Sequence, residues 1–321
     1  MNKENLASAI RQLCEEKNAI IMAHYYTRPE IQDVADFIGD SLALAQQATR
    51  VHADIIVMCG VHFMGETMKI LCPDKKVLIP DMAAGCSLAD SCKAEDLKKF
   101  IESQRQALSR NDQRPIVVSY VNTSADVKAL TDVVVTSSNA KHIVDQLPQD
   151  AKIIFGPDKN LGSYINSVTG REMILWDGAC HVHSRFSLEA LLELKKQYPN
   201  APVLAHPECK AVILLQADKI GSTKALLEFT KSSAARQFIV VTESGILHEM
   251  QKACPDKEFI PVPPEATEAI GCHCNECEYM RLNTLEKLYA CLRDETPEIH
   301  VEPSVAERAL RPIQRMLEMS S

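Results

Sequence analysis

The 321-residue chain has only eleven glycines, and the glycine-rich motifs that hold nucleotide phosphates are missing from it. No G-x-G occurs, so the dinucleotide-binding fingerprint is absent, and so is the G-x-x-x-x-G-K-S/T phosphate loop. The sequence also lacks G-x-S-x-G and H-E-x-x-H, the motifs of many serine hydrolases and zinc peptidases. These absences argue against a nicotinamide-dependent enzyme and against an NTPase.

The chain also lacks a run of basic residues and a long apolar stretch. Its net charge is −8, which argues against a nucleic-acid partner, because phosphates need a basic surface. The longest apolar runs, such as Ile55–Cys59, are far too short to cross a bilayer, which argues against a membrane protein. The first sixteen residues read as an amphipathic helix with Leu6 and Ile10 on one side, rather than as a signal peptide. We therefore expect a soluble protein of the reducing cytoplasm.

Cysteine, by contrast, is abundant, with twelve in the chain. In a reducing compartment these thiols are not expected to pair, so some of them are candidate metal ligands or reactive groups. Five lie within apolar patterns, where a free cysteine behaves as a small core residue. These five, which we predict to be structural, are Cys14, Cys59, Cys72, Cys254 and Cys291.

Short apolar runs alternate with helical patterns along almost the whole chain. The runs are apolar throughout, which is typical of parallel strands buried on both faces, and the alternation predicts an α/β fold. Ile31, Ala35, Ile38, Leu42 and Ala45 follow helical spacing. The predicted strands are Ala19–Ala23, Ile55–Cys59, Val77–Pro80, Ile116–Ser119, Val133–Thr136, Ile153–Phe155, Met173–Trp176, Pro202–Ala205, Phe238–Thr242 and Phe259–Val262.

A weak threefold pattern overlies this alternation, with a cysteine near the end of each section. Residues 19–90, 116–183 and 202–280 each begin with a strand and a polar cluster, and end near Cys86, Cys180 or Cys277. The pattern predicts three similar α/β units that each contribute one cysteine. We place the domains at residues 1–95, 96–184 and 185–321, the last with C-terminal helices.

Polar residues gather where the predicted strands end, and ligands of parallel α/β sheets bind beyond the carboxyl ends of the strands. Together they indicate a site for a small anionic substrate, lined by hydroxyl and imidazole groups. Ser137-Ser138 and Ser222-Thr223 each precede a helix, where they are either anion ligands or simple N-caps. The residues of this set are His24, Tyr26, Ser41, Tyr120, Asn122, Ser137, His206, Glu208, Ser222 and Thr223.

The strongest local cysteine signal is Cys272-x-Cys274-x-x-Cys277. A zinc ribbon would need a second pair with similar spacing, and none exists. Three thiolates from distant segments, Cys86 and Cys180 with one of this group, could instead hold a [4Fe–4S] cluster with one iron free of protein ligands. Such an iron can act as a Lewis acid on a substrate. Cysteine spacing alone does not decide whether these residues bind an iron–sulfur cluster.

The motifs, taken in order, resemble those of the quinolinate synthase family, and the resemblance covers nearly the whole chain. The matching segments are Ala23-His24-Tyr25-Tyr26, Gly39-Asp40-Ser41-Leu42, residues 60–67, Ala84-Gly85-Cys86-Ser87-Leu88-Ala89-Asp90, Tyr120-Val121-Asn122-Thr123, Thr136-Ser137-Ser138-Asn139-Ala140, residues 176–183, Ala205-His206-Pro207-Glu208-Cys209, Gly221-Ser222-Thr223 and Cys277-Glu278-Tyr279-Met280.

The resemblance implies three pseudo-equivalent αβα domains with parallel sheets, arranged with pseudo-threefold symmetry around one oxygen-sensitive [4Fe–4S] cluster. Its ligands would be Cys86, Cys180 and Cys277. Some members carry C-x-x-C-x-x-C where this chain has C-x-C-x-x-C, and Cys277 is chosen because it directly precedes Glu278-Tyr279-Met280. The family condenses iminoaspartate, which a separate L-aspartate oxidase supplies, with dihydroxyacetone phosphate. The products are quinolinate, a precursor of NAD, phosphate and two waters.

The resemblance also assigns roles to the strand-end residues. Glu208 is the candidate base, Tyr26 an acid–base or orienting group, and His183 lies beside them at the chemical end, near the open iron. This agrees with the needs of a dehydration, which takes a base near a carbon acid and an electrophile at the departing hydroxyl. The residues expected to bind substrate are His24, Ser41, Tyr120, Asn122, Ser137, His206 and Thr223.

Two other interpretations stay open at this point. A metal-free aldolase acting on the same ketose phosphate could form a Schiff base on Lys210, beside Glu208. A regulator that binds zinc or an iron–sulfur cluster without catalysis is the second, although the acidic balance and the lack of a basic helix count against it.

Overall fold

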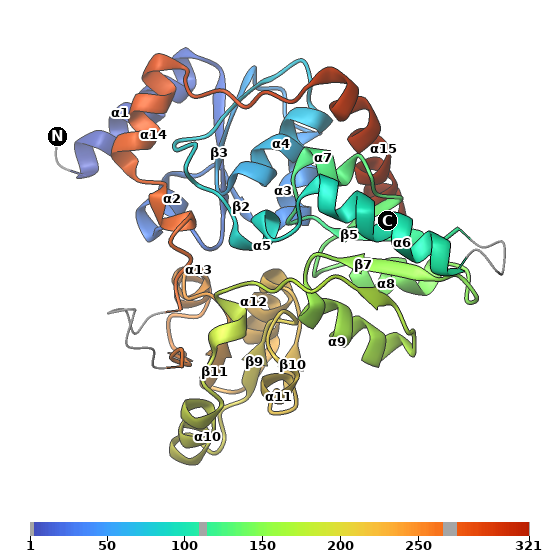
Figure 1. Cartoon of the computed structure of the whole chain (residues 1–321). Coiled ribbons are helices and arrows are strands. Elements are labelled where there is room, and N and C mark those ends of the chain that lie inside the picture. Colours follow the sequence, from blue (N-terminus) through green and yellow to red (C-terminus); the bar gives the residue numbers. More distant parts are fainter. Residues whose placement is uncertain (1–2, 109–113, 266–274, 321) are drawn as a thin grey trace.

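A computed structural model of the chain describes residues 3–108, 114–265 and 275–320. In this part of the chain, three four-stranded sheets share one strand order, with β2-β1-β3-β4 in the first, β6-β5-β7-β8 in the second and β10-β9-β11-β12 in the third (Figure 1). Every pair of neighbouring strands in them is parallel. We refer to each sheet with its helices as the first, second and third unit. The predicted threefold α/β architecture is confirmed.

The first unit runs from the N-terminus to the first cysteine turn. Its central strands are buried throughout, as in β3, whose five residues are all buried, because helices cover both faces of a parallel sheet. Its elements are α1 (Lys3–Glu16), β1 (Ala19–His24), α2 (Pro29–Val34), β2 (Phe37–Gly39), α3 (Ser41–Ala48), β3 (Ile55–Cys59), α4 (His62–Leu71), β4 (Lys76–Leu78) and α5 (Ser87–Asp90).

The second and third units repeat this order of elements. The second consists of α6 (Ala94–Leu108), β5 (Ile116–Tyr120), α7 (Ala125–Lys128), β6 (Val133–Val135), α8 (Ala140–Gln146), β7 (Ile153–Gly156), α9 (Lys159–Thr169) and β8 (Ile174–Leu175). The third consists of the short helix η2 (His183–Arg185), α10 (Leu188–Gln197), β9 (Val203–Ala205), α11 (Ala211–Leu214), β10 (Lys219–Ile220), α12 (Thr223–Ser232), β11 (Gln237–Val241), α13 (Ile246–Ala253) and β12 (Glu258–Pro261).

The helix expected across residues 31–45 is wrong. The segment splits into α2, β2 and α3, because Phe37–Gly39 pairs with β1 and Asp40 caps α3 by accepting the amide of Ala43. Lys219–Ile220 is a second short strand that the pattern did not predict. In both places, pairing with a neighbouring buried strand outweighs the weak local preference of a very short segment.

The C-terminal helices return to the first two units (Figure 1). After η3 (Met280–Leu282), α14 (Leu285–Asp294) places Leu288 and Leu292 in a core shared with α1, β1 and β3. The last helix, α15 (Pro303–Met319), contacts α4, α7 and β6, and Ile313 and Met316 are fully buried there. The domain boundaries proposed above remain a prediction. The structure adds that the segment after the third sheet packs against the first two units, with α14 on the first and α15 on both.

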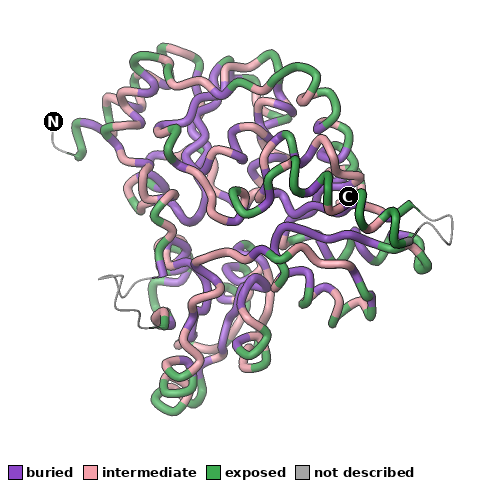
Figure 2. The backbone as a smooth tube through the Cα atoms, in the orientation of Figure 1, coloured by how far each residue is buried: buried purple, intermediate pink, exposed green. Residues whose placement is uncertain are grey.

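Buried stretches, purple in Figure 2, run through the inside of the units, and exposed stretches lie mostly at the periphery. Residues that follow β1, β5 and β9, the first strand of each sheet, line one shared cavity at the junction of the three units. Within the described ranges, no helix is both long and apolar enough to span a bilayer.

Candidate active site

One cavity at the junction brings together every side chain of the predicted set except Ser222, which caps α12 by accepting the amide of Ala225. It has about 740 Å³ of empty space, part of which is open to solvent. The predicted residues among its walls are His24, Tyr26, Ser41, Cys86, Tyr120, Asn122, Ser137, Cys180, His183, His206, Glu208, Thr223 and Cys277. Their roles stay predictions, but the structure shows that these distant segments share one surface.

The internal repeat explains why these residues meet. The first strand of each sheet ends in a pair of cavity residues two positions apart: His24 and Tyr26, then Tyr120 and Asn122, then His206 and Glu208. In each pair the second residue lies in the turn or bend that follows the strand, and both members line the same space. Three equivalent pairs from three units thus form the floor of the cavity.

Hydroxyl groups at the starts of helices form a second part of the wall. Ser41 is the first residue of α3 and Thr223 the first of α12, and their amides lie at the positive ends of the helix dipoles. Ser137 lies in the turn before α8 and is 3.2 Å from Nε2 of His206. The described lining residues include no Lys or Arg. An anionic group there would be bound by neutral donors and helix N-termini.

Both carboxylate oxygens of Glu208 contact other side chains of the cavity. Tyr120 donates its hydroxyl to Oε1 at 2.5 Å, and Nδ1 of His183 lies 3.0 Å from Oε2. Burial alone would raise the pKa of Glu208, but His183, His206 and the hydrogen bonds from His183 and Tyr120 outweigh burial and lower it. The group is therefore a carboxylate at neutral pH, hydrogen-bonded through both oxygens.

The other titratable groups of the floor are neutral. Burial lowers the pKa of His24 to about 4 and that of His206 to about 3, so both imidazoles are uncharged near pH 7. Burial also raises the pKa values of Tyr26 and Tyr120 well above the ordinary value, so both phenols keep their protons. The floor of the cavity thus combines the carboxylate of Glu208 with neutral groups that can donate or accept a hydrogen bond.

Thr242 contacts two residues of the cavity wall, and sequence reasoning missed it. Its Oγ1 lies 2.9 Å from the hydroxyl of Tyr26 and 3.0 Å from Nε2 of His183. The phenol of Tyr26 is also 2.8 Å from Oγ1 of Thr223. Thr242 directly follows β11, but the strand was predicted to include it. Ligand groups of parallel sheets follow strand ends. If the strand had been predicted to end at Val241, this rule would have marked Thr242 as a candidate.

The three candidate metal ligands line the same cavity from three different segments. Burial raises the pKa of the Cys86 thiol to about 12 and that of Cys277 to about 11, and it raises the pKa of Cys180 well above the ordinary value. Nearby thiols add to these shifts, Cys277 and Cys180 each interacting electrostatically with Cys86. Three desolvated thiols that face one space suit a cationic, sulfur-binding group, which would stabilise them as thiolates.

Two buried carboxylates hold the backbone beside two of these cysteines, and sequence reasoning missed both. Asp158, which follows β7, accepts the amide of Cys180 at 2.9 Å through Oδ2. Glu243, which follows β11, accepts the amide of Cys277 at 3.1 Å through Oε1. The two acids occupy equivalent places in the second and third units. Their position just after a strand was the available signal.

A single metal ion would suit a different group of side chains. Donor atoms of Cys180, His183 and Glu208 all lie within 4.8 Å of one another, close enough to share one ion. Among the described residues, the three cysteines of the cavity do not form such a close group.

The remaining cysteines fit their predicted structural role. The five predicted to be structural, Cys14, Cys59, Cys72, Cys254 and Cys291, are buried and free. Cys272 and Cys274, whose role the sequence left open, lie outside the described residues.

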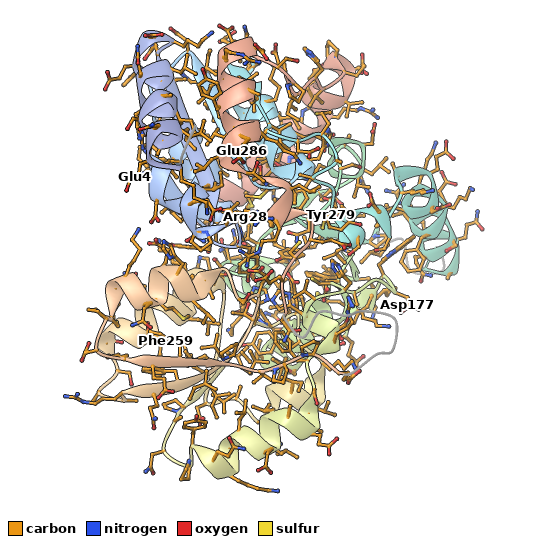
Figure 3. The ribbon with its side chains drawn as sticks, turned by 90° about the vertical axis from the view of Figure 1, so that its left-hand side faces the viewer. Glu4, Arg28, Asp177, Phe259, Tyr279 and Glu286 are labelled. Carbon is orange, nitrogen blue, oxygen red and sulfur yellow. The ribbon has the colours of Figure 1, made fainter. Side chains whose placement is uncertain are left out.

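Residues that closely follow the three cysteines, Ser87, His181 and Tyr279, also line the cavity. Oγ of Ser87 lies 2.5 Å from Nδ1 of His181, and the His181 ring meets the ring of Tyr279 edge-on at 6.1 Å. Figure 3 shows Tyr279 near the middle of the molecule, where the first unit approaches the third. Residues close in sequence to all three cysteines thus contact one another in the cavity wall.

The lysine of the Schiff-base interpretation lies elsewhere. Nζ of Lys210 pairs with Oε1 of Glu265 at 3.0 Å, and both side chains are about half exposed. Lys210 is not part of the cavity wall. A nucleophilic lysine needs a place beside the substrate, so this arrangement speaks against that mechanism.

Comparisons with known proteins agree on one family. Residues 8–318 match the family model described as "Quinolinate synthetase A protein". The chain is 54% identical over 319 residues to a quinolinate synthase from Microcystis aeruginosa, covering 99% of this chain and 96% of the relative. It is 54% identical to a quinolinate synthase from Chloroherpeton thalassium, covering 100% and 96%, and 55% identical to one from Thermosynechococcus vestitus, covering 98% and 96%.

Proposed function

The chain belongs to the quinolinate synthase family, and from this membership we propose that it condenses iminoaspartate with dihydroxyacetone phosphate. The products would be quinolinate, phosphate and two waters. One observation carries the proposal: Cys86, Cys180 and Cys277 line the same cavity as Glu208 and Tyr26. This observation is independent of the family membership, because it shows that thiols and acid–base groups from three separate units share one cavity.

One [4Fe–4S] cluster is the proposed cofactor, with Cys86, Cys180 and Cys277 as its ligands. The support is the donor set, since three desolvated thiols that line one cavity are suited to iron–sulfur ligation. When bound, the cluster would supply an iron without a protein ligand as a Lewis acid toward a substrate oxygen or nitrogen.

The two anionic substrates would be held by the hydroxyl and imidazole wall. Ser41 and Thr223 present hydroxyls and amides at helix N-termini, where carboxylate or phosphate oxygens are favoured. His206 and Ser137 lie within hydrogen-bond distance of each other and offer a second pair of contacts. His24 and Asn122 complete this wall. Binding by neutral donors avoids a strong ion pair that would hold the product as tightly as the substrate.

Glu208 is the proposed base. It is a carboxylate inside a buried site, and His183 and Tyr120 fix its orientation. A base in this position could remove a proton from a substrate carbon. Tyr26 keeps its proton at neutral pH and is the proposed donor to a departing hydroxyl. The buried walls keep bulk water from competing for these protons.

Two further parts of the assignment rest on the same membership. A separate L-aspartate oxidase would supply the iminoaspartate, so this chain would act in the biosynthesis of NAD. The reducing cytoplasm is the proposed location, where free cysteines and an oxygen-sensitive cluster are both maintained.

An anaerobic assay for quinolinate with both substrates tests the reaction. Purified, reconstituted protein should form quinolinate and release phosphate in equal amounts, and a sample without the ketose phosphate should form none. Absence of quinolinate from protein that carries a full complement of iron and sulfide would refute the proposal. Lys210→Met should keep full activity, which distinguishes this reaction from Schiff-base catalysis.

Cysteine variants test the cofactor separately. Cys86→Ser, Cys180→Ser and Cys277→Ser should each lose the brown visible absorbance of the cluster and most of the bound iron. Cys14→Ser and Cys291→Ser are matched controls, because they remove buried thiols outside the cavity. Zinc in place of iron and sulfide in anaerobically purified protein would favour the single-ion group of Cys180, His183 and Glu208 instead.

A further inference from the structure

The short helices after β1 and β5 each carry one buried polar side chain at the same position. Gln32 is the fourth residue of α2, and Lys128 is the fourth residue of α7. Each lies eight positions beyond the first cavity residue of its unit, which is His24 in the first unit and Tyr120 in the second. The exposed fraction is 1% for Gln32 and 0% for Lys128. Polar groups this deeply buried need hydrogen-bond partners, and the partners show what each residue does.

Gln32 binds the backbone on both sides of Tyr26. Its Nε2 donates to the carbonyl oxygens of Tyr25 at 2.9 Å and Thr27 at 2.8 Å, and it lies 3.1 Å from the carbonyl oxygen of Gly245. Because all three partners are acceptors, the amide nitrogen must face them and the amide oxygen must turn away. The segment that carries Tyr26 is therefore held to α2 at two points, next to the third unit.

Lys128 makes the same pair of contacts around Asn122. Its Nζ donates to the carbonyl oxygen of Val121 at 2.9 Å and to that of Thr123. The same Nζ lies 5.3 Å from the centre of the ring of Phe63, which lines the cavity. An ammonium group has three hydrogens and no acceptor, so two carbonyls and the face of a ring suit it well. A lysine in the second unit thus does what a glutamine does in the first.

The third unit lacks this contact. The residue at the equivalent place is Leu214, the fourth residue of α11, and its side chain cannot donate a hydrogen bond. The carbonyl oxygen of Glu208 itself accepts instead from Nδ2 of Asn160, in α9 of the second unit, at 3.1 Å. The third unit has the same fold without a donor at this place. The buried donors of the first two units therefore serve the segments they hold rather than the fold that is repeated.

Two held carbonyls control the direction of the residue between them. Tyr26 and Asn122 lie in the turn or bend after a strand, outside the paired part of the sheet. Because each peptide unit is planar, binding the carbonyl on either side restricts the peptide planes next to the cavity residue, and with them the direction of its side chain. Neither Gln32 nor Lys128 lines the cavity, so each can act on the reaction only through its neighbour.

We propose that Gln32 and Lys128 are positioning residues of the active site, which direct Tyr26 and Asn122 into the cavity by binding the carbonyls on either side of them. The proposal rests on the roles proposed above, with Tyr26 as the proton donor and Asn122 as part of the substrate-binding wall. The two residues therefore affect different kinetic constants. Gln32 supports the chemical step, and Lys128 supports substrate binding.

Gln32→Met and Lys128→Met each remove the donor and keep an unbranched side chain. In Gln32→Met, kcat for quinolinate formation should fall by roughly 10- to 100-fold, because a small misplacement of a reacting group is costly. KM should stay within about threefold. In Lys128→Met, KM for one substrate should rise by roughly tenfold, which corresponds to one lost hydrogen bond, and kcat should stay within about threefold. A purely structural role would lower the folded fraction in both variants and could not separate kcat from KM.

The chain offers a matched control for each variant. Gln251 donates to the carbonyl oxygens of Pro255 and Lys257, and Lys257 donates to those of Thr230 and Ser233. Both thus bind two backbone carbonyls, as Gln32 and Lys128 do, but none of these carbonyls belongs to a neighbour of a cavity residue. Gln251→Met and Lys257→Met should therefore leave kcat and KM unchanged.

Crystal structures of the variant holoenzymes give a readout that does not depend on turnover. The Tyr26 ring should be displaced in Gln32→Met and the Asn122 amide in Lys128→Met, while the other side chain keeps its wild-type place. Unmoved side chains would overturn the proposal, as would equal changes of kcat and KM in the two variants. If wild type forms no quinolinate, the proposed function fails, and the two side-chain positions still decide whether Gln32 and Lys128 are positioning residues.

Milder variants cover the case in which a methionine variant does not fold. Gln32→Asn and Lys128→Gln keep a donor on a shorter side chain, so they should show the same separation of kcat from KM to a smaller degree. Equal effects of these two variants on both constants would assign Gln32 and Lys128 a structural role and overturn the proposal.

Discussion

Glu208→Gln changes one atom of the carboxylate on which the proposed chemistry depends. In the wild type, Oε1 accepts from Tyr120 at 2.5 Å and Oε2 faces Nδ1 of His183 at 3.0 Å. A glutamine of the same shape has only one oxygen. If that oxygen stays with Tyr120, the new amide hydrogens face the N–H of His183, and if it turns to His183 they face the hydroxyl of Tyr120.

The size of the effect follows from these two contacts. One charge-assisted hydrogen bond is lost and the other becomes neutral, and a hydrogen bond to a charged group contributes about 1.5–3 kcal/mol. Removing a general base itself costs about 10²- to 10⁴-fold in rate. We therefore expect kcat to fall by at least about 100-fold, which corresponds to about 3 kcal/mol in the activation barrier. KM should change little, because Glu208 is not proposed to bind the anionic ends.

The assay is anaerobic quinolinate formation, with iron and sulfide measured on the same samples. The variant should carry the same cluster content as wild type, since Glu208 is not a proposed ligand. Glu298→Gln is a matched control, because that carboxylate pairs with Lys69 at 3.4 Å outside the cavity. Turnover within threefold of wild type at full cluster content would remove Glu208 as the base. Loss of iron together with activity would point to metal binding by Glu208 instead.

Three further predictions concern groups around the cavity. Burial lowers the pKa of Lys128 to about 8, against about 10.4 in an unfolded chain. Between these two pH values the unfolded state binds more protons than the folded state. The free energy of unfolding should therefore rise with pH across that interval, by roughly 3 kcal/mol at most. Lys128→Met should remove this rise in anaerobic urea titrations, and an equal slope in both proteins would contradict the assignment. In Gly245→Ala, the added Cβ would lie 2.7 Å from Cα of Tyr26, so the first and third units must separate; we expect a lower Tm and a reduced kcat, and wild-type values of both would refute this contact. Asp158→Asn turns an acceptor into a donor opposite a backbone amide, so the variant should lose iron to a chelator faster than wild type, whereas equal rates of loss would show that Asp158 does not support the Cys180 turn.

Most of the architecture could be predicted because its signals are local. A strand buried on both faces is apolar at every position, as in Ile55–Cys59, and that pattern is visible without a structure. The cavity residues were found for a related reason. Parallel sheets put ligand groups at strand ends, and His24, Tyr120 and His206 each lie at the end of a predicted strand.

The missed parts depend on contacts between distant segments. The strands Phe37–Gly39 and Lys219–Ile220 are too short for a clear period, and pairing with β1 and β9 decides their conformation. Lys128 ends a one-turn helix and looks like a surface residue, yet it is fully buried and donates to the backbone oxygen of Val121 at 2.9 Å. Such burial follows from how the units pack, which no short window of sequence contains.

The roles of Asp158, Thr242 and Glu243 escaped prediction for the same reason. Each follows a strand, which marks it as a candidate, but their importance comes from partners such as Cys180, Tyr26 or Cys277 that lie far away in the sequence. A hydrogen bond between units has no periodicity to recognise. The resemblance to the family identified the residues with known motifs and was silent about those that only hold them in place.

Several hydrogen bonds of the cavity join one unit to another, and this makes the arrangement of the units part of the proposed catalytic machinery. Tyr26 reaches Thr242 between the first and third units, and Tyr120 reaches Glu208 between the second and third. Ser138 donates to Asp40 at 2.6 Å between the second and first. Because a hydrogen bond weakens steeply when its atoms move apart by a few tenths of an ångström, a small rotation of one unit would break several of these contacts at once. A substitution far from the cavity that loosens the packing of α14 or α15 on the first two units should therefore reduce turnover before it unfolds the chain, since the individual sheets would survive a shift that the shared site would not.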